Sequence, residues 1–284
     1  NGNNVLGTVI AANDGSFSIT SSVLPDDIYT LTVRATDLAG NVSAESVGLP
    51  IEIDTTSPAT PVITTDIALT KINTPTIEGT AEAGSTVELF NGSDSLGTVI
   101  AADNGTFSIT SSQLADANYT LTVTATDEAG NTSDPSAGLP ITIDTTAPAA
   151  PVITTTTALT NIDTPTIEGT AEAGSRVELF NGSESLGTVN AGNDGNFSIT
   201  STQLADADYT LTVTATDAAG NTSVPSTELP ITIDTTAPDA PVITTTTSLT
   251  NITTPTIEGT AEAESIVELF NGSKSLGTAI AGSD

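Results

Sequence analysis

Apolar and polar residues alternate in short stretches along the whole chain, and no stretch keeps a helical period. The clearest is YTLTVTATD at 119–127. Its Tyr119, Leu121, Val123 and Ala125 point to one face and its threonines to the other. The neighbouring stretches of the same kind are PVITT at 61–65, TPTIEGTAE at 74–82, TVELF at 86–90, SLGTVIAA at 95–102, TFSIT at 106–110 and GLPITID at 138–144. The pattern predicts seven short strands within about 90 residues.

An asparagine–glycine pair lies between neighbouring predicted strands at two places. The pair at 91–92 predicts a hairpin turn, and the pair at 104–105 predicts another change of direction. Short strands joined by such turns are typical of a Greek-key β-sandwich of immunoglobulin type. The predicted fold class is therefore all-β.

The same sequence returns every 90 residues. DTT begins at Asp54, Asp144 and Asp234, and TPTIEGTAEA begins at Thr74, Thr164 and Thr254. A unit of this size can bury its own core, which predicts tandem domains. The expected domains are the C-terminal part of a repeat at 1–53, complete repeats at 54–143 and 144–233, and the N-terminal part of a repeat at 234–284.

Equivalent positions of the repeats carry two further signals. Tyr119 opens the sixth strand just after a turn, where these sandwiches place a tyrosine corner; an ordinary core tyrosine is the alternative. The same position is occupied by Tyr29 and Tyr209. Glu264 replaces a glycine that stands at Gly84 and Gly174, so we expect a tight turn there to relax.

Composition excludes several functions. The chain has 35 Asp and Glu against four Lys and Arg, a net charge of -31, and no His, Cys, Met or Trp. It therefore lacks an imidazole base, a thiol nucleophile, and nitrogen or sulfur ligands for zinc. Its few cations predict no binding to nucleic acid, and no apolar run is long enough for membrane insertion. Paired acids such as Asp206 and Asp208 suit turns, and the chain is not expected to be an enzyme.

ATDEAGN at 125–131, DTTAPAAP at 144–151 and TPTIEGTAEAGS at 164–175 resemble the bacterial Ig-like tandem repeats of giant secreted surface adhesins and biofilm-associated proteins. Those proteins leave the cell by type I secretion. The resemblance implies an extracellular location on a bacterial cell surface and an extended rod of repeats stiffened by calcium at the domain junctions. The partners it implies are adjacent repeats of the same chain, with any host-cell, surface or matrix ligand bound by regions outside this segment.

The residues themselves also point to calcium. Immunoglobulin topology should bring the linker residue Asp144 close to Glu172, Asp217 and Asn221 in the loops of the next repeat. The equivalent set at the preceding junction is Asp54, Glu82, Asp127 and Asn131. Carboxylates gathered without a cation repel one another, and calcium accepts six to eight oxygen ligands in loose geometry. These eight residues are the predicted metal ligands.

Simpler interpretations of the same acidic residues are also possible alternatives to metal binding. An aspartate at a strand end commonly forms a turn, and Asp127 could bind nearby backbone N–H groups. A second acidic stretch precedes the sixth strand, with ADAD at 205–208, ADAN at 115–118 and PDDI at 25–28. A solvated turn is favoured there over additional calcium ligands.

Near-identical repeats with small loops favour a structural stalk that projects an adhesive region for attachment or biofilm formation. The alternatives are an Ig-like module that binds a glycan or protein, a filament or surface-layer component, and an accessory array on a secreted hydrolase. Aromatic or variable loops would mark a binding module, and the aromatic residues are only six Phe and three Tyr.

Overall fold

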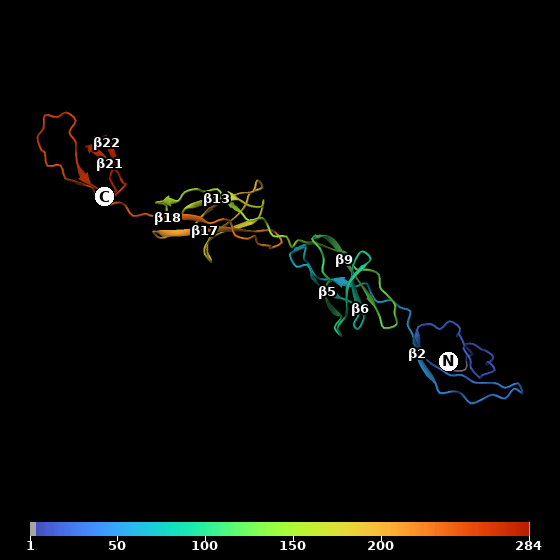
Figure 1. The fold of residues 1–284 in the computed structure, drawn as a ribbon. Coiled ribbons are helices and arrows are strands. Elements are labelled where there is room, and N and C mark those ends of the chain that lie inside the picture. The colour runs from blue at the N-terminus through green and yellow to red at the C-terminus, as the bar shows by residue number, and fades with distance from the viewer. Residues whose placement is uncertain (1–3, 284) are drawn as a thin grey trace. The chain divides into compact units, whose positions relative to one another are not determined.

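The structure is a computed structural model that describes residues 4–283. Within that range it contains strands and no helix, and therefore no helix that could span a membrane. The chain divides into two compact units. One contains the chain up to Thr146 with Ala218–Asn221, and the other contains Ala147–Asp217 and Thr222 onward. Figure 1 traces the elements from blue to red along the sequence.

The complete repeat of the first unit is a sandwich of two sheets. The larger sheet has the order β4 (Leu69–Thr70), β10 (Leu139–Ile143), β9 (Ala117–Thr126), β6 (Thr86–Asn91) and β7 (Asp94–Ile100). The smaller sheet has the order β3 (Val62–Ile63), β5 (Thr76–Thr80) and β8 (Thr106–Thr110). Neighbours are antiparallel except β4 and β10, which are parallel. The predicted immunoglobulin-type sandwich is confirmed.

The complete repeat of the second unit has the same two sheets. The larger has the order β12 (Leu159–Thr160), β18 (Leu229–Ile233), β17 (Ala207–Thr216), β14 (Arg176–Asn181) and β15 (Glu184–Asn190). The smaller has the order β11 (Val152–Ile153), β13 (Thr166–Thr170) and β16 (Asn196–Thr200). The 90-residue sequence repeat is therefore a repeat of structure.

The first predicted strand, at 61–65, contains β3, and a second short strand, β4, follows it. β3 pairs with β5 in the smaller sheet, and the chain then crosses to the larger sheet, where β4 pairs with β10. Each strand is only two residues long. Alternation over so few residues gives no readable period, so the sequence pattern predicted only the first of them.

The core lies between the sheets and follows the alternation. Leu121 and Val123 on β9 are fully buried, as are Ile77 on β5 and Leu89 on β6. Phe107 on β8 and Ile141 on β10 belong to the same cluster. The second repeat has an equivalent cluster around Ile167, Leu179, Leu211 and Val213. Each complete repeat therefore buries its own apolar residues, which is the main stabilising contribution to such a domain.

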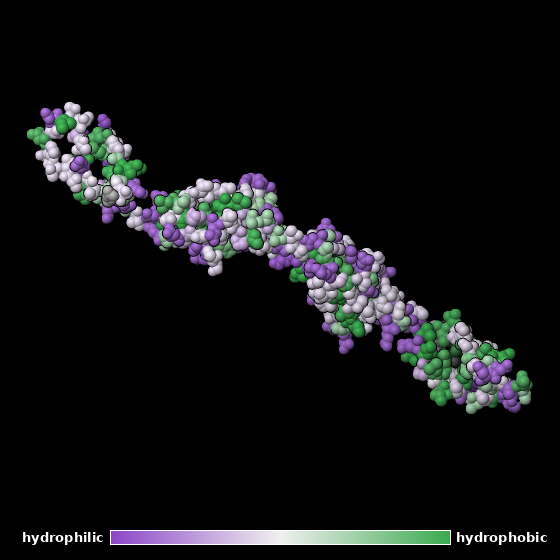
Figure 2. Space-filling model, in the orientation of Figure 1, coloured by the Kyte–Doolittle hydropathy of each residue, from purple (hydrophilic) through white to green (hydrophobic). Residues whose placement is uncertain are grey.

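The partial repeats leave equivalent residues exposed. Residues 4–53 contain β1 (Asp27–Leu31) and β2 (Leu49–Ile53), and residues 234–283 contain β19 (Val242–Ile243), β20 (Gly259–Thr260), β21 (Ile266–Asn271) and β22 (Lys274–Ile280). Phe17 is 57% exposed, against 4% for the equivalent Phe107. Leu269 is 37% exposed, whereas Leu89 is fully buried. Apolar surface is accordingly visible on the N-terminal segment in Figure 2.

The tyrosine corner is confirmed. The Tyr119 hydroxyl donates a hydrogen bond to the Ala115 carbonyl oxygen, with 3.0 Å between the oxygens. Tyr209 does the same to Ala205 at 3.1 Å, and Tyr29 to Pro25 at 2.8 Å. The bond fixes the turn before β9 to the strand itself.

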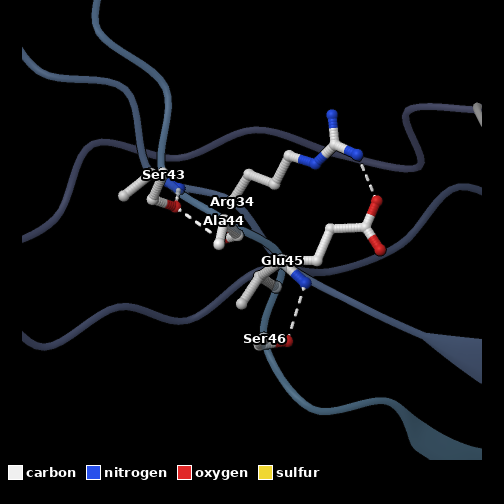
Figure 3. A network of polar contacts seen from close by, with 7 residues as sticks. Arg34, Ser43, Ala44, Glu45 and Ser46 are labelled. Carbon is white, nitrogen blue, oxygen red and sulfur yellow. Dashed lines mark hydrogen bonds and ion pairs between the residues drawn. The ribbon is translucent and has the colours of Figure 1, made fainter.

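Two buried serines, which precede β10 in the chain, continue the pairing of β9 past the first residue of β10. Ser136 Oγ accepts a hydrogen bond from Val123 N at 3.1 Å, and Ser133 Oγ accepts one from Ala125 N at 3.0 Å. Buried N–H groups need such partners. Ser43 and Ser46 have the same role in the first partial repeat, beside an ion pair of Arg34 with Glu45 (Figure 3).

The turn at Glu264 does not relax as expected. Glu264 has a φ of 65°, close to the 80° and 77° of Gly84 and Gly174. Its N–H donates to the Ala281 carbonyl oxygen at 3.1 Å, as Gly174 N–H does to Ala191. The turn therefore keeps its shape, and the glutamate adopts a left-handed conformation that is unfavourable for a residue with a Cβ.

This turn yields a stability prediction. Gly174→Glu should lower the free energy of unfolding of its repeat by about 1 kcal/mol, because the left-handed conformation costs ~1–2 kcal/mol and a stiffer unfolded chain offsets part of that. No atom lies within 4 Å of a Cβ at this position, so steric overlap adds nothing. Chemical denaturation measures the change, with Ala173→Glu as the control for added charge. Equal effects of the two variants would contradict the prediction.

Candidate functional site

The linker aspartates each start a small turn. Asp54 directly follows β2, and its Oδ1 accepts a hydrogen bond from Thr56 N at 2.9 Å. Asp144 and Asp234 make the same bond to Thr146 N and Thr236 N, each at 3.1 Å. This is the local backbone bond that aspartate forms in turns. The turn-forming reading of these residues is therefore correct.

A second aspartate, in the turn before β9, binds the two linker threonines. Asp116 Oδ1 accepts from Thr145 N at 3.0 Å and from Thr145 Oγ1 at 2.7 Å. Its Oδ2 accepts from Thr146 Oγ1 at 2.7 Å. We call this arrangement the Asp–Thr–Thr clamp. The other two copies are Asp206 with Thr235 and Thr236, and Asp26 with Thr55 and Thr56.

The clamp stabilises the ionised carboxylate. Hydrogen bonds from the hydroxyls of Thr146 and Thr145 hold the pKa of Asp116 below its ordinary value. The Thr235 and Thr236 hydroxyls likewise lower the pKa of Asp206. The sequence pattern predicted a solvated turn in this stretch and did not predict the clamp. The available signal was an Asp followed 29 and 30 residues later by Thr in every repeat.

The loop after β9 reaches the linker at Asp54, which precedes its own repeat. Asp127 Oδ1 accepts from Asn131 N and its Oδ2 from Asn131 Nδ2, both at 2.8 Å. Asn131 Nδ2 also donates to the main-chain oxygen of Asp54 at 3.1 Å. The Asn131 side chain is the largest cause that lowers the pKa of Asp127. Asp54, Asp127 and Asn131 therefore come together as predicted, through direct hydrogen bonds.

The remaining predicted ligands divide into two groups. Asn221 Nδ2 donates to the Asp144 main-chain oxygen at 2.8 Å, as its equivalent does at Asp54. Asp217 follows β17 at the position of Asp127. Glu82 and Glu172 have exposed side chains, and their main-chain oxygens accept bonds from Ser85 and Ser175 in a tight turn.

These residues fit a hydrogen-bonded junction better than a preformed metal cage. In the described part of the chain, no three acidic side chains are grouped so that they could hold a metal ion. Both oxygens of Asp127 already accept bonds from Asn131. A calcium ion would therefore have to share these oxygen atoms with existing donors. Calcium binding at the eight predicted residues stays a prediction.

The lowered pKa of Asp127 gives a pH prediction. A carboxylate whose folded-state pKa is below its unfolded value stabilises the fold above the unfolded pKa, and this contribution is lost as pH falls through the folded pKa. Asp127→Asn should therefore be less stable than the original protein at pH 7, and the gap should close in acid. Denaturation curves from pH 7 to 2 measure it, with Glu128→Gln as the charge control. A gap that is constant with pH would contradict the assignment.

The chain matches one protein family and is similar in sequence to an exoglucanase and a chitinase. Residues 1–55, 62–145 and 153–235 match the family described as bacterial Ig-like domain. The chain is 34% identical over 234 residues to Exoglucanase B of Cellulomonas fimi, which covers 73% of this chain and 20% of that protein. It is 34% identical over 131 residues to Chitinase A1 of Niallia circulans, which covers 42% and 18%. The chain thus spans about a fifth of the length of these relatives.

Solved structures resemble it more distantly. The fibronectin(III)-like modules of Clostridium thermocellum CbhA align with a TM-score of 0.42 at 19% identity, covering 61% of this chain and 94% of theirs. The BSP domain of a biofilm associated protein aligns with a TM-score of 0.26 at 24% identity, covering 63% and 30%. The three matched segments cover most of the chain, which belongs to the family of bacterial Ig-like domains.

Proposed function

We propose that this chain is a non-catalytic spacer from an extracellular or cell-surface bacterial protein, in which tandem Ig-like repeats form a stalk that projects an adhesive region. One observation carries the proposal: the linker at Asp54 is bonded on both sides. Asp26 binds Thr55 and Thr56 from the preceding repeat, and Asn131 binds the Asp54 main chain from the following one. A linker bonded in this way restricts bending between the repeats it joins.

The distribution of aromatic residues supports a spacer over a glycan-binding module. In the complete repeats, Phe107 and Phe197 are buried in the cores, and Tyr119 and Tyr209 pack against them. Phe90 and Phe180 are also partly buried. Every aromatic side chain of residues 54–233 is at least partly buried, so these repeats offer no flat exposed ring on which a sugar could stack.

Net charge supports the same function. A charge of -31 on 284 residues gives long-range repulsion between neighbouring copies and keeps them dispersed. The family match, the repeated linker bonds and this charge are all properties of a spacer, and none requires a ligand.

A second candidate is a spacer within a secreted glycan hydrolase. The 34% identity to Exoglucanase B over 234 residues favours it. In that case the repeats would separate a catalytic part from another module, and their mechanical role would be unchanged. Retention on insoluble cellulose or chitin would instead indicate a binding module.

Small-angle scattering tests the stalk. Strands of about 8 residues span ~26 Å at ~3.3 Å per residue, and turns and linker bring each repeat to roughly 40 Å. The 284-residue chain should therefore scatter as an elongated particle whose length grows by that step with each added repeat. A compact particle would overturn the proposal.

We also propose that calcium stiffens the junctions, with Asp54, Glu82, Asp127 and Asn131 as ligands at one and Asp144, Glu172, Asp217 and Asn221 at the next. The proximity of Asp54, Asp127 and Asn131 supports it. Calcium would supply positive charge at the junction and so offset the repulsion among the carboxylates.

Calcium should raise the melting temperature of the chain, and EDTA should lower it. Extracellular sites bind calcium with dissociation constants of ~10⁻⁴–10⁻³ M, and ligand at about 100 times that constant stabilises by ~2.7 kcal/mol per site. Differential scanning calorimetry measures the shift, with magnesium as the control ion. Coincident melting curves in calcium and EDTA would rule out these sites.

A further inference from the structure

The Asp-Thr-Thr segments at 144–146 and 234–236 are bonded to the repeat that precedes them and within themselves. Asp144 N donates to the Thr70 carbonyl oxygen at 3.0 Å, Thr145 N to Asp116, and Thr146 N to Asp144 Oδ1. The next linker repeats all three bonds, with Asp234 N donating to Thr160 O at 3.0 Å. Every backbone N–H of the Asp-Thr-Thr segment is thus satisfied before the chain enters the following repeat.

The clamp aspartate is itself fixed in place. Asp116 directly follows Ala115, whose carbonyl oxygen accepts the tyrosine-corner bond from Tyr119. Tyr119 lies on β9, the strand paired on both edges, with β6 and β10. The carboxylate therefore projects from a turn anchored to the central strand of the larger sheet, and its two oxygens accept hydrogen bonds from both threonines.

The burial of the proline that follows each Asp-Thr-Thr segment differs among the three linkers. Pro58 and Pro148 are buried, whereas the equivalent Pro238 is exposed. All three follow the same Asp-Thr-Thr sequence and the same clamp. The difference is that Pro238 is followed by a partial repeat, and Pro58 and Pro148 by complete ones. The prolines are therefore buried by the repeat that follows them.

From these two facts we propose that each linker is divided between its neighbours, and that the covalent joint between repeats is the one residue between the two parts. The bonds from Asn131 to the Asp54 main chain and from Asn221 to the Asp144 main chain span that joint from the following repeat. The Asp–Thr–Thr clamp assigns residues 54–56, 144–146 and 234–236 to the preceding repeat. Proline burial assigns the chain from Pro58 and from Pro148 to the following one. The joints are then Ser57 and Ala147, with Ala237 at the equivalent place. This division is independent of whether the chain acts as a spacer.

Hydrogen exchange of the linker amides tests the division. In the full 284-residue chain, Asp116→Ala should speed exchange at Thr145 and Thr146 by about tenfold or more, because both amides lose protection that depends on the clamp. Exchange at Thr235 and Thr236 should not change, since Asp206 remains. Mass spectrometry distinguishes the two sites when the peptides begin at Gly138 and Glu228, which differ in sequence.

Matched variants separate the clamp from general destabilisation. Asp103→Ala removes an acid from an exposed turn of the same repeat and should leave Thr145 and Thr146 protected. Thr145→Val should expose the segment, and Thr145→Ser, which retains the hydroxyl, should not. If Asp116→Ala also speeds exchange within β9, the repeat has unfolded. The comparison of Thr145→Val with Thr145→Ser then decides whether the clamp protects the linker amides.

Two results would overturn the division. The first is unchanged exchange at Thr145 and Thr146 in both Asp116→Ala and Thr145→Val. The second is protection in the original chain that disappears in EDTA, which would mean that a bound ion, rather than the threonine hydroxyls, holds the aspartate. Protection that persists in EDTA and depends on Asp116 supports the clamp, whatever scattering shows about overall shape.

Discussion

Hydrogen bonds from neutral donors to carboxylates hold the linkers and the loops beside them. With 35 acidic and four basic side chains, ion pairs can satisfy few of the acids. Threonine hydroxyls, asparagine amides and backbone N–H groups take that role instead, at Asp116 and at Asp127. A hydrogen bond to a charged group is stronger than one between neutral groups. The junctions therefore depend on carboxylates that remain ionised.

Much of the fold follows from the sequence because its periods are strong. Alternation at 119–127 places Leu121 and Val123 in the core, and the position of Tyr119 after a turn predicts a tyrosine corner, whose partner in the structure is the Ala115 carbonyl oxygen. The serine pairs were beyond prediction, since Ser136 bonds Val123 across a loop and serine has no pattern of its own. Glu264 was also misjudged, because the surrounding backbone bonds of the turn outweigh the preference of one side chain.

The candidate site was predicted in its location and less well in its chemistry. Topology alone brings the loop of Asp127 and Asn131 to the linker at Asp54. The partner of the linker threonines depends on the register between β9 and β10, which sets Asp116 beside the end of β10. Register cannot be read from alternation, because a shift of two residues keeps every side chain on its face.

The parallel pairing of β4 with β10 has a mechanical consequence. β4 lies near the start of the repeat and β10 at its end, and the two strands run in the same direction. A force that draws the two ends apart therefore slides these strands past each other along their length. Their hydrogen bonds share such a shear load simultaneously, whereas a load across the strands would open them one at a time. The repeat is thus arranged to resist pulling along the chain direction, and each copy added to a tandem array would resist in the same way.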